Sequence, residues 1–208
     1  MTDRTQPSYL RPYADSARRF GGGFGSLLWA SRATQRIRFD VMIGMIDFKD
    51  RIVVDAGAGR GDLLRHLLKR GIQPATYIGI EAVDALADRM EADALPGCQV
   101  VRGDFVKDPK HLFVGAEVVV FSGSLNTLPP RAFHTTLQRA FEATSQCVLF
   151  NFLSGPALAA AEHLHWHERA DVETFIRSLT TEYRSFDTYL PGDCTIRADR
   201  MEDDTVTR

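Results

Sequence analysis

The sequence has few cysteines and no long apolar run, and each of these absences excludes a class of protein. The three cysteines, Cys98, Cys147 and Cys194, are widely spaced and odd in number, so they form neither a disulfide framework nor a metal-binding motif. No apolar run approaches the roughly eighteen residues that cross a bilayer. The polar N-terminus also lacks the apolar centre of a secretory signal. We therefore expect a cytoplasmic protein that does not act at a membrane.

An excess of basic charge is also absent. The chain has 25 lysines and arginines against 27 acidic residues, a net charge of −2, so no broad basic face indicates nucleic acid. The N-terminal segment is locally basic, which we interpret as solvated helix faces, at Arg18, Arg19, Arg32, Arg36 and Arg38. A chain of 208 residues is long enough to bury the core of one domain and to add a modest lid.

The most informative feature that is present is a glycine-rich turn between a predicted strand and a predicted helix. An apolar run ends at Asp55, and Gly57, Gly59 and Gly61 then alternate with other residues. The dinucleotide fingerprint is Gly-x-Gly-x-x-Gly, and the position of its third glycine is Asp62 here. An acid at this place repels a pyrophosphate. Together with Asp55 it favours a ligand that carries an ammonium and a sulfonium, as S-adenosylmethionine does.

Acids also end the next two predicted strands. Glu81 follows an apolar run about twenty residues beyond the loop, where a carboxylate can accept hydrogen bonds from both ribose hydroxyls. Asp104 ends the third strand and is placed to accept from an adenine amino group, and the ring of Phe105 can lie against the base. Three acids in register predict a nucleoside-binding edge of a parallel sheet.

The periodicity of the chain alternates between strand and helix, which predicts a parallel sheet covered on both faces. One helix is expected over 26–46, and a turn at 191–193 predicts an antiparallel hairpin of the runs 183–190 and 195–201. A first strand is expected to begin at Ile52, and further strands are expected over 76–82, 98–105, 117–122 and 147–153. The other helices are expected over 61–70, 83–93, 130–143 and 169–180.

With these motifs the chain resembles the class I S-adenosylmethionine-dependent methyltransferases, from about Trp29 to about Met201. The first family motif is matched by residues 55–61, the ribose-binding acid by Glu81 and the adenine-side motif by residues 103–105. The resemblance implies an α/β, Rossmann-like three-layer sandwich with a mostly parallel seven-stranded sheet and a C-terminal antiparallel hairpin. Residues 1–47 are then expected to form a helical lid segment and residues 48–208 the methyltransferase domain.

The resemblance also implies a site for S-adenosyl-L-methionine and, in the loop after the fourth strand, a place for the substrate at Asn126. The fourth strand ends without the acid that many family members carry there. No acid stands beside Asn126 to hold magnesium, so metal-independent chemistry is expected. We further hypothesise that Arg38 or Arg32 pairs with the methionine carboxylate. The expected cofactor-binding residues are Asp55, Gly57, Ala58, Gly59, Gly61, Glu81, Ala82, Asp104, Phe105, Ser122 and Arg38.

Histidines gather around Trp166. If their segment is helical, His163 and His167 share a face at a spacing able to hold zinc, but no cysteine or suitably spaced partner accompanies them. A surface lid is the preferred interpretation of this segment. The identity of any general base stays open among His134, His163, His165, His167, Asp187 and Tyr189.

The sequence thus predicts methyl transfer to an oxygen, nitrogen or carbon atom of a small-molecule acceptor. Nucleic acid is not favoured, because the charge is slightly acidic and the Asn-Pro-Pro-aromatic signature of base methylation is absent. Two alternatives remain. One is an NAD(P)-dependent oxidoreductase, and the other is a non-catalytic methyltransferase-like module that binds a partner.

Overall fold

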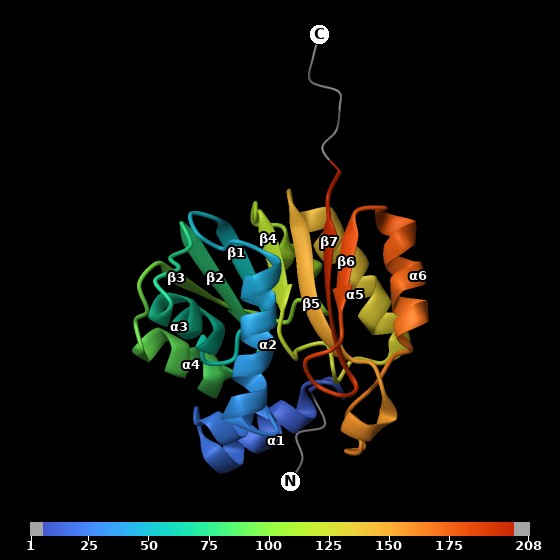
Figure 1. Cartoon of the computed structure of the whole chain (residues 1–208). Coiled ribbons are helices and arrows are strands. Elements are labelled where there is room, and N and C mark those ends of the chain that lie inside the picture. Colours follow the sequence, from blue (N-terminus) through green and yellow to red (C-terminus); the bar gives the residue numbers. More distant parts are fainter. Residues whose placement is uncertain (1–5, 202–208) are drawn as a thin grey trace.

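A seven-stranded sheet forms the centre of the molecule in the computed structural model, which describes residues 6–201 (Figure 1). The strand order is β3-β2-β1-β4-β5-β7-β6. The strands β1 to β5 run parallel, and β7 is antiparallel to both β5 and β6. This confirms the mostly parallel sheet with a C-terminal antiparallel hairpin. The strands are β1 (Ile52–Ala56), β2 (Thr76–Glu81), β3 (Cys98–Arg102), β4 (Val118–Phe121), β5 (Cys147–Leu153), β6 (Tyr183–Phe186) and β7 (Asp193–Asp199).

Helices cover both faces of the sheet because its central strands are apolar on both sides. Every residue of β4 and β5 is buried, as expected for strands between two helical layers. On one face, α2 (Arg32–Met45) and α3 (Asp62–Lys69) pack against β1, β2, β4 and β5. On the other face, α5 (Pro130–Ala143) and α6 (Arg169–Leu179) complete the larger core. The helix α4 (Asp84–Ala92) lies against β2 and β3. The predicted three layers are therefore confirmed.

The N-terminal part of the chain differs from the single helix expected over 26–46. A helix α1 (Arg11–Phe20) and a short 3-10 helix η1 (Phe24–Leu27) come first, and α2 begins only at Arg32. The expectation was wrong because Leu28 adopts the left-handed region at φ 57°. Ser31 then caps the new helix, since its Oγ accepts from the backbone nitrogen of Thr34 at 3.1 Å.

The order of the parallel strands creates a crevice at one edge of the sheet. From β1 the chain moves outward to β2 and β3, and it then crosses to β4 on the other side of β1. The loops that follow β1 and β4 therefore leave in opposite directions, and open parallel sheets bind their ligands at such a point. No helix within residues 6–201 combines the length and the apolar character that a membrane crossing requires.

Candidate functional site

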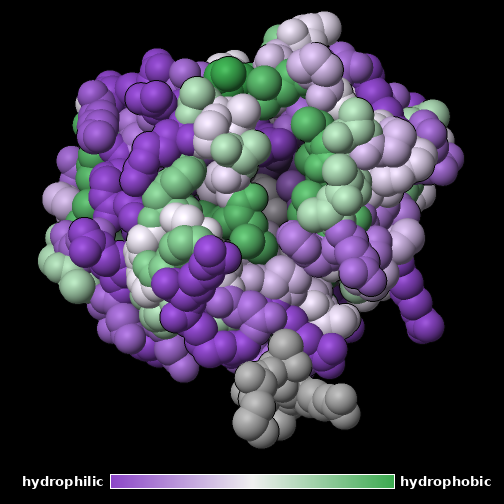
Figure 2. All heavy atoms as spheres, turned by 90° about the horizontal axis from the view of Figure 1, so that it is seen from below, coloured by the Kyte–Doolittle hydropathy of each residue, from purple (hydrophilic) through white to green (hydrophobic). Residues whose placement is uncertain are grey.

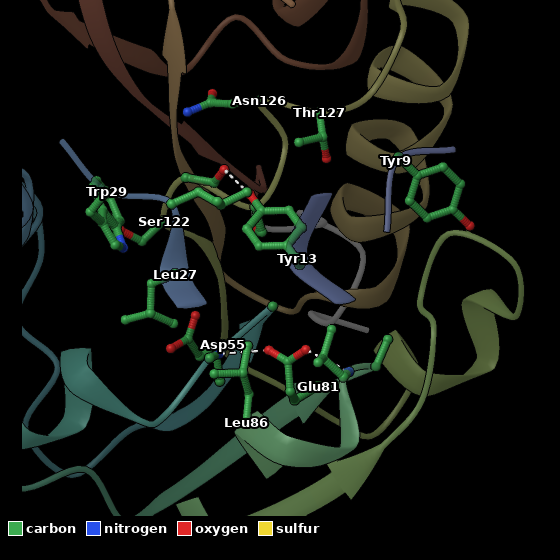
Figure 3. A pocket seen from close by; sticks show the side chains of 18 of the residues that line it. Tyr9, Tyr13, Leu27, Trp29, Asp55, Glu81, Leu86, Ser122, Asn126 and Thr127 are labelled. Atoms are coloured by element: carbon green, nitrogen blue, oxygen red, sulfur yellow. Dashed lines mark hydrogen bonds between the residues drawn. The ribbon is translucent and has the colours of Figure 1, made fainter. Parts of the chain in front are cut away.

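A cavity lies at the carboxyl ends of β1, β2 and β4 and is covered by the N-terminal segment (Figure 3). Gly61 lies outside the cavity wall and instead begins α3 as its left-handed cap. The structure brings the other expected site residues together in the wall, namely Arg38, Asp55, Gly57, Ala58, Gly59, Glu81, Ala82, Asp104, Phe105, Ser122 and Asn126. Their assignment to a particular ligand stays a prediction.

The glycine loop has a backbone that other residues rarely adopt. Gly57, Gly59 and Gly61 have φ of 82°, 59° and 73°. A Cβ atom on Gly59 would lie 2.6 Å from Cδ2 of Leu27, and one on Gly57 would overlap the side chain of Ser124. Glycine is therefore needed here both for the turn and for the close approach of the N-terminal segment.

Glu81 joins the end of β2 to the glycine loop. Its Oε2 accepts from the backbone nitrogen of Gly59, and its Oε1 accepts from that of Val83, both at 2.8 Å. Burial raises the pKa of Glu81 to about 7, although these backbone donors oppose the shift. The carboxylate is thus held rigidly in the cavity wall and keeps lone pairs for further donors.

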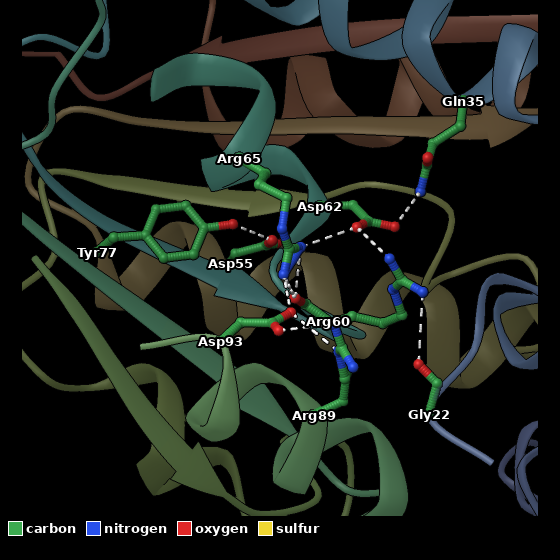
Figure 4. Close-up of polar contacts among 9 residues, drawn as sticks. All are labelled: Gly22, Gln35, Asp55, Arg60, Asp62, Arg65, Tyr77, Arg89 and Asp93. Atoms are coloured by element: carbon green, nitrogen blue, oxygen red, sulfur yellow. Dashed lines mark hydrogen bonds and ion pairs between the residues drawn. The ribbon is translucent and has the colours of Figure 1, made fainter. Parts of the chain in front are cut away.

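Asp55 is the penultimate residue of β1, beside this loop, and is also buried. The hydroxyl of Tyr77 donates to its Oδ2 (Figure 4). Burial raises the pKa of Asp55 to about 7, the Tyr77 hydrogen bond opposes the shift, and the charge of Asp62 adds to it. The sequence gives no sign of this partner, because Tyr77 lies within the apolar run of a buried strand.

Asp62 is less free to attract a cation than the sequence predicted. Its Oδ1 accepts from Arg60 at 3.3 Å and from Arg65 at 3.1 Å, and its Oδ2 accepts from Gln35 at 3.3 Å (Figure 4). Arg65 also pairs with Asp93. Two guanidinium groups therefore offset the charge that was expected to repel a pyrophosphate.

Asp104 is already engaged within the protein. Its Oδ2 accepts from the hydroxyl of Tyr9 at 2.7 Å, and its Oδ1 accepts from the backbone nitrogens of Val106 and Lys107 at 3.0 and 3.1 Å. The adjacent Phe105 lines the cavity and packs edge-on against Phe121, with 5.6 Å between the ring centroids. An adenine amino group at Asp104 would have to share or replace the Tyr9 hydroxyl.

Arg38 is buried in an ion pair that the sequence did not predict. Its guanidinium pairs with Asp193, at the start of β7, and lies 4.7 Å from the centroid of the Trp29 ring. Asp193 also accepts from the hydroxyl of Tyr189 at 2.7 Å. Arg32 instead lies over the ring of Phe24 and lines a groove between α2 and α3, outside this cavity. Of the two arginines, only Arg38 lines the cavity, so the hypothesis of a pair with the methionine carboxylate now concerns Arg38 alone.

The N-terminal segment supplies wall residues that were not predicted from the sequence. The hydroxyl of Tyr13 donates to the carbonyl of Gly123 at 3.4 Å, and burial raises the pKa of this tyrosine above its ordinary value. Trp29 lies against Gly123, where a Cβ atom would come within 3.1 Å of its ring. Large aromatic residues in a polar, glycine-broken segment were the available signal for these wall residues.

The loop after β4 presents two buried polar atoms without a partner among the described residues, Ser122 Oγ and Asn126 Oδ1. The loop itself is well held, because Ser124 Oγ donates to the carbonyl of Ala56 at 2.5 Å. In addition, Gly123 donates its N–H to Asn151 Oδ1 at 2.8 Å. A buried polar atom without a partner is costly, so a ligand group is the natural partner of each.

The histidine segment is not helical at 163–167, so His163 and His167 do not share a helix face. His167 is buried and stacks on Phe133 at 4.0 Å, and burial lowers its pKa to about 4. None of the residues weighed as a general base lines the cavity within the described part of the chain. In residues 6–201, no three His, Cys, Asp or Glu side chains gather in a way that could hold a metal ion.

No protein-family model matches the chain, and no curated protein matches its sequence. Solved structures do match its fold. A magnesium protoporphyrin IX methyltransferase from Synechocystis with bound SAH is 14% identical, covers 90% of this chain and 94% of its own, and has a TM-score of 0.67.

Two further neighbours agree. An O-methyltransferase family protein from Burkholderia thailandensis is 18% identical over 92% of this chain and 66% of its own, with a TM-score of 0.68. A SAM-dependent methyltransferase from Archaeoglobus fulgidus is 15% identical over 80% and 94%, with a TM-score of 0.61. The chain therefore has the fold of the class I S-adenosylmethionine-dependent methyltransferases.

Proposed function

We propose that this protein binds S-adenosyl-L-methionine in the covered cavity and transfers the methyl group to a small-molecule acceptor without a metal ion. The observation that carries the proposal is that three acids, of which Asp55 and Glu81 are buried, line the cavity at the glycine loop. Asp55, Glu81 and Asp104 all line one cavity, at the point where a sheet of this fold opens. Similar structures were solved with SAM or SAH bound, which supports the choice of ligand.

The chemistry of the wall fits this cofactor. Glu81 keeps acceptor capacity for ribose hydroxyls, and Phe105 offers a ring edge beside Asp104 for the base. Asp55 lies next to the glycine loop and can hold an ammonium, which would also favour its ionised form. Ser122 Oγ is unpartnered within residues 6–201 and faces the same cavity, which makes it a further contact. Arg38, on the same helix as Gln35, is the cation in the wall that would pair with the methionine carboxylate.

The protein then contributes position and exclusion of water. A sulfonium methyl is already activated, so the acceptor atom has to lie in line with the S–CH3 bond. Residues 1–47 act as the lid in this proposal, although residues 1–5 and, at the other end of the domain, 202–208 lie outside the described residues. Tyr9 and Tyr13 hold the described part of the lid over the cavity through Asp104 and Gly123.

Calorimetric titration with S-adenosylhomocysteine, in parallel with NADH, tests the proposal. We expect micromolar binding of the first ligand alone. Glu81→Ala should weaken it by at least about tenfold, because the lost contact is charge-assisted. Glu142→Ala serves as the matched control, since this acid is exposed on α5 and contacts Gln138.

The other outcomes separate the alternatives. Binding of NADH alone would favour the oxidoreductase. Binding of neither ligand by a folded protein would favour a non-catalytic module that acts through a partner.

A further inference from the structure

Away from the glycine loop and α4, leucines give the cavity wall an apolar part, called the apolar side below; Leu27 and Leu86 also lie beside Asp55 and Glu81 (Figure 3). Leucines from five separate segments line the apolar side, namely Leu10, Leu128, Leu153, Leu158 and Leu164. This end of the molecule is seen in Figure 2, where hydrophobic residues surround a hollow. Leu158 is 39% exposed, which places it at the rim.

Backbone hydrogen bonds tie the segment that carries Leu164 to Asn126 and to Leu153. The nitrogen of His165, next to Leu164, donates to the carbonyl of Asn126 at 2.7 Å. The nitrogen of His167 donates to the carbonyl of Leu153 at 2.9 Å. The segment before α6 is therefore tied both to the loop after β4 and to the end of β5. Leu164 is consequently the sequence neighbour of a residue that contacts Asn126, and Leu128 follows Asn126 by two residues in the loop after β4; all three line the cavity.

Asn126 brings an unsatisfied acceptor to this apolar side. The residue is 8% exposed, it lines the cavity, and its Oδ1 has no partner among the described residues. A buried carbonyl oxygen needs a donor. The donors available in an occupied cavity are an N–H or O–H of the ligand, which an ether, a thioether or an ionised carboxylate cannot supply.

The charges of the wall act against an anionic acceptor. The acids Asp55, Glu81 and Asp104 share the cavity, and the guanidinium of Arg38 is already paired with Asp193. A carboxylate or phosphate on the acceptor would meet these acids, and the Arg38 guanidinium would already be shared between Asp193 and the methionine carboxylate of the proposed cofactor.

We propose that the acceptor is an uncharged, largely apolar molecule whose reacting hydroxyl or amine donates a hydrogen bond to Asn126 Oδ1. The proposal rests on the proposed function. In the transfer, a lone pair of the acceptor oxygen or nitrogen forms the new bond to the methyl carbon. The carbon–sulfur bond breaks with its electron pair going to sulfur, and the acceptor's proton passes to solvent. Asn126 orients the nucleophile and does not take up this proton.

The test uses the full chain saturated with S-adenosylhomocysteine and four ligands that share one apolar skeleton. These are 4-butylphenol, 4-butylaniline, 4-butylbenzoate and 4-butylanisole, which offer a hydroxyl, an amine, a carboxylate and no donor. We expect the phenol or the aniline to bind at least about tenfold more tightly than the benzoate and the anisole. Whichever of the two binds more tightly distinguishes an oxygen from a nitrogen acceptor.

Two variants separate the hydrogen bond from the apolar wall. Asn126→Leu should bring the affinities for the phenol and the anisole to within about threefold of each other. The control Gln138→Leu removes an amide from the exposed face of α5 and should preserve the difference. Leu158→Ser, at the exposed rim, should weaken all four ligands together. Tighter binding of the benzoate, or binding of none of the four by protein that binds S-adenosylhomocysteine, would overturn the acceptor class. Failure to bind S-adenosylhomocysteine itself would overturn the proposed function instead.

Discussion

The raised pKa of Glu81 predicts that the affinity for adenosine depends on pH. Adenosine carries the ribose hydroxyls of the proposed cofactor but no group that titrates near neutral pH. If the ribose binds the ionised carboxylate and the pKa is about 7, the ionised fraction rises from about 9% at pH 6 to about 91% at pH 8. We therefore expect the association constant to rise about tenfold, or about 1.4 kcal/mol, over this interval.

Calorimetry of the wild type and of Glu81→Gln between pH 6 and pH 8 measures this dependence. The variant keeps an acceptor oxygen but no charge, so its affinity should be lower at pH 8 and nearly independent of pH. Wild-type affinity that stays flat across the interval would refute the reasoning. A slope that survives in the variant would transfer the titration to Asp55, whose pKa is raised to about 7 as well.

The same shift has a consequence for stability, and its sign follows from proton binding. In the folded state Glu81 holds its proton up to about pH 7, whereas in the unfolded chain it releases the proton near its ordinary value of 4.5. The native state therefore binds more protons in this window, and stability falls as the pH rises through it. The free energy of unfolding is measured with urea on the ligand-free wild type and on Glu81→Gln at pH 5 and pH 7. The value for the wild type minus that for the variant should be lower at pH 7 than at pH 5.

Two further predictions concern the lid and its anchor. Gly59→Ala places a methyl group 2.6 Å from Leu27 at φ 59°, so it should reduce both stability and S-adenosylhomocysteine affinity. Gly44→Ala, at an open position in the last turn of α2, should raise the free energy of unfolding by at most about 0.5–1 kcal/mol. Arg38→Met should lower the free energy of unfolding by about 3–5 kcal/mol, because it leaves Asp193 buried without its partner. A urea denaturation series measures the free energy of unfolding of all three variants. A loss below about 1 kcal/mol for Arg38→Met would contradict the prediction for that variant.

The sheet and the glycine loop were predictable because their signals are local. A β-branched run followed by alternating glycines, as in residues 52–61, requires a strand and a tight turn whatever the rest of the chain does. Strand-end acids such as Glu81 are placed by the same local pattern, since the carboxyl ends of parallel strands meet at one edge. The hairpin was predictable from Pro191 and Gly192 for the same reason, but its bounds were wrong: β6 already ends at Phe186, residues 187–192 form the connection, and Asp193 belongs to β7.

The contacts between distant segments were not predictable. The Arg38–Asp193 pair spans 155 residues and the Tyr9–Asp104 bond spans 95, and neither partner carries a local sign of the other. The break in the expected N-terminal helix was not predictable for a different reason. A left-handed Leu28 is unfavourable in isolation, so tertiary packing has to impose it.

The ion pair between Arg38 and Asp193 also orders events during synthesis of the chain. Ribosomes deliver α2 early and β7 near the end, yet β7 is the strand that lies between β5 and β6 and carries the partner of Arg38. A nascent chain that has already completed β1 to β5 therefore has its glycine loop but still lacks the anchor of its lid. The Arg38 anchor is consequently gained only when β7 joins the sheet, whereas Asp104 and Gly123, which bind Tyr9 and Tyr13, are synthesised before β5.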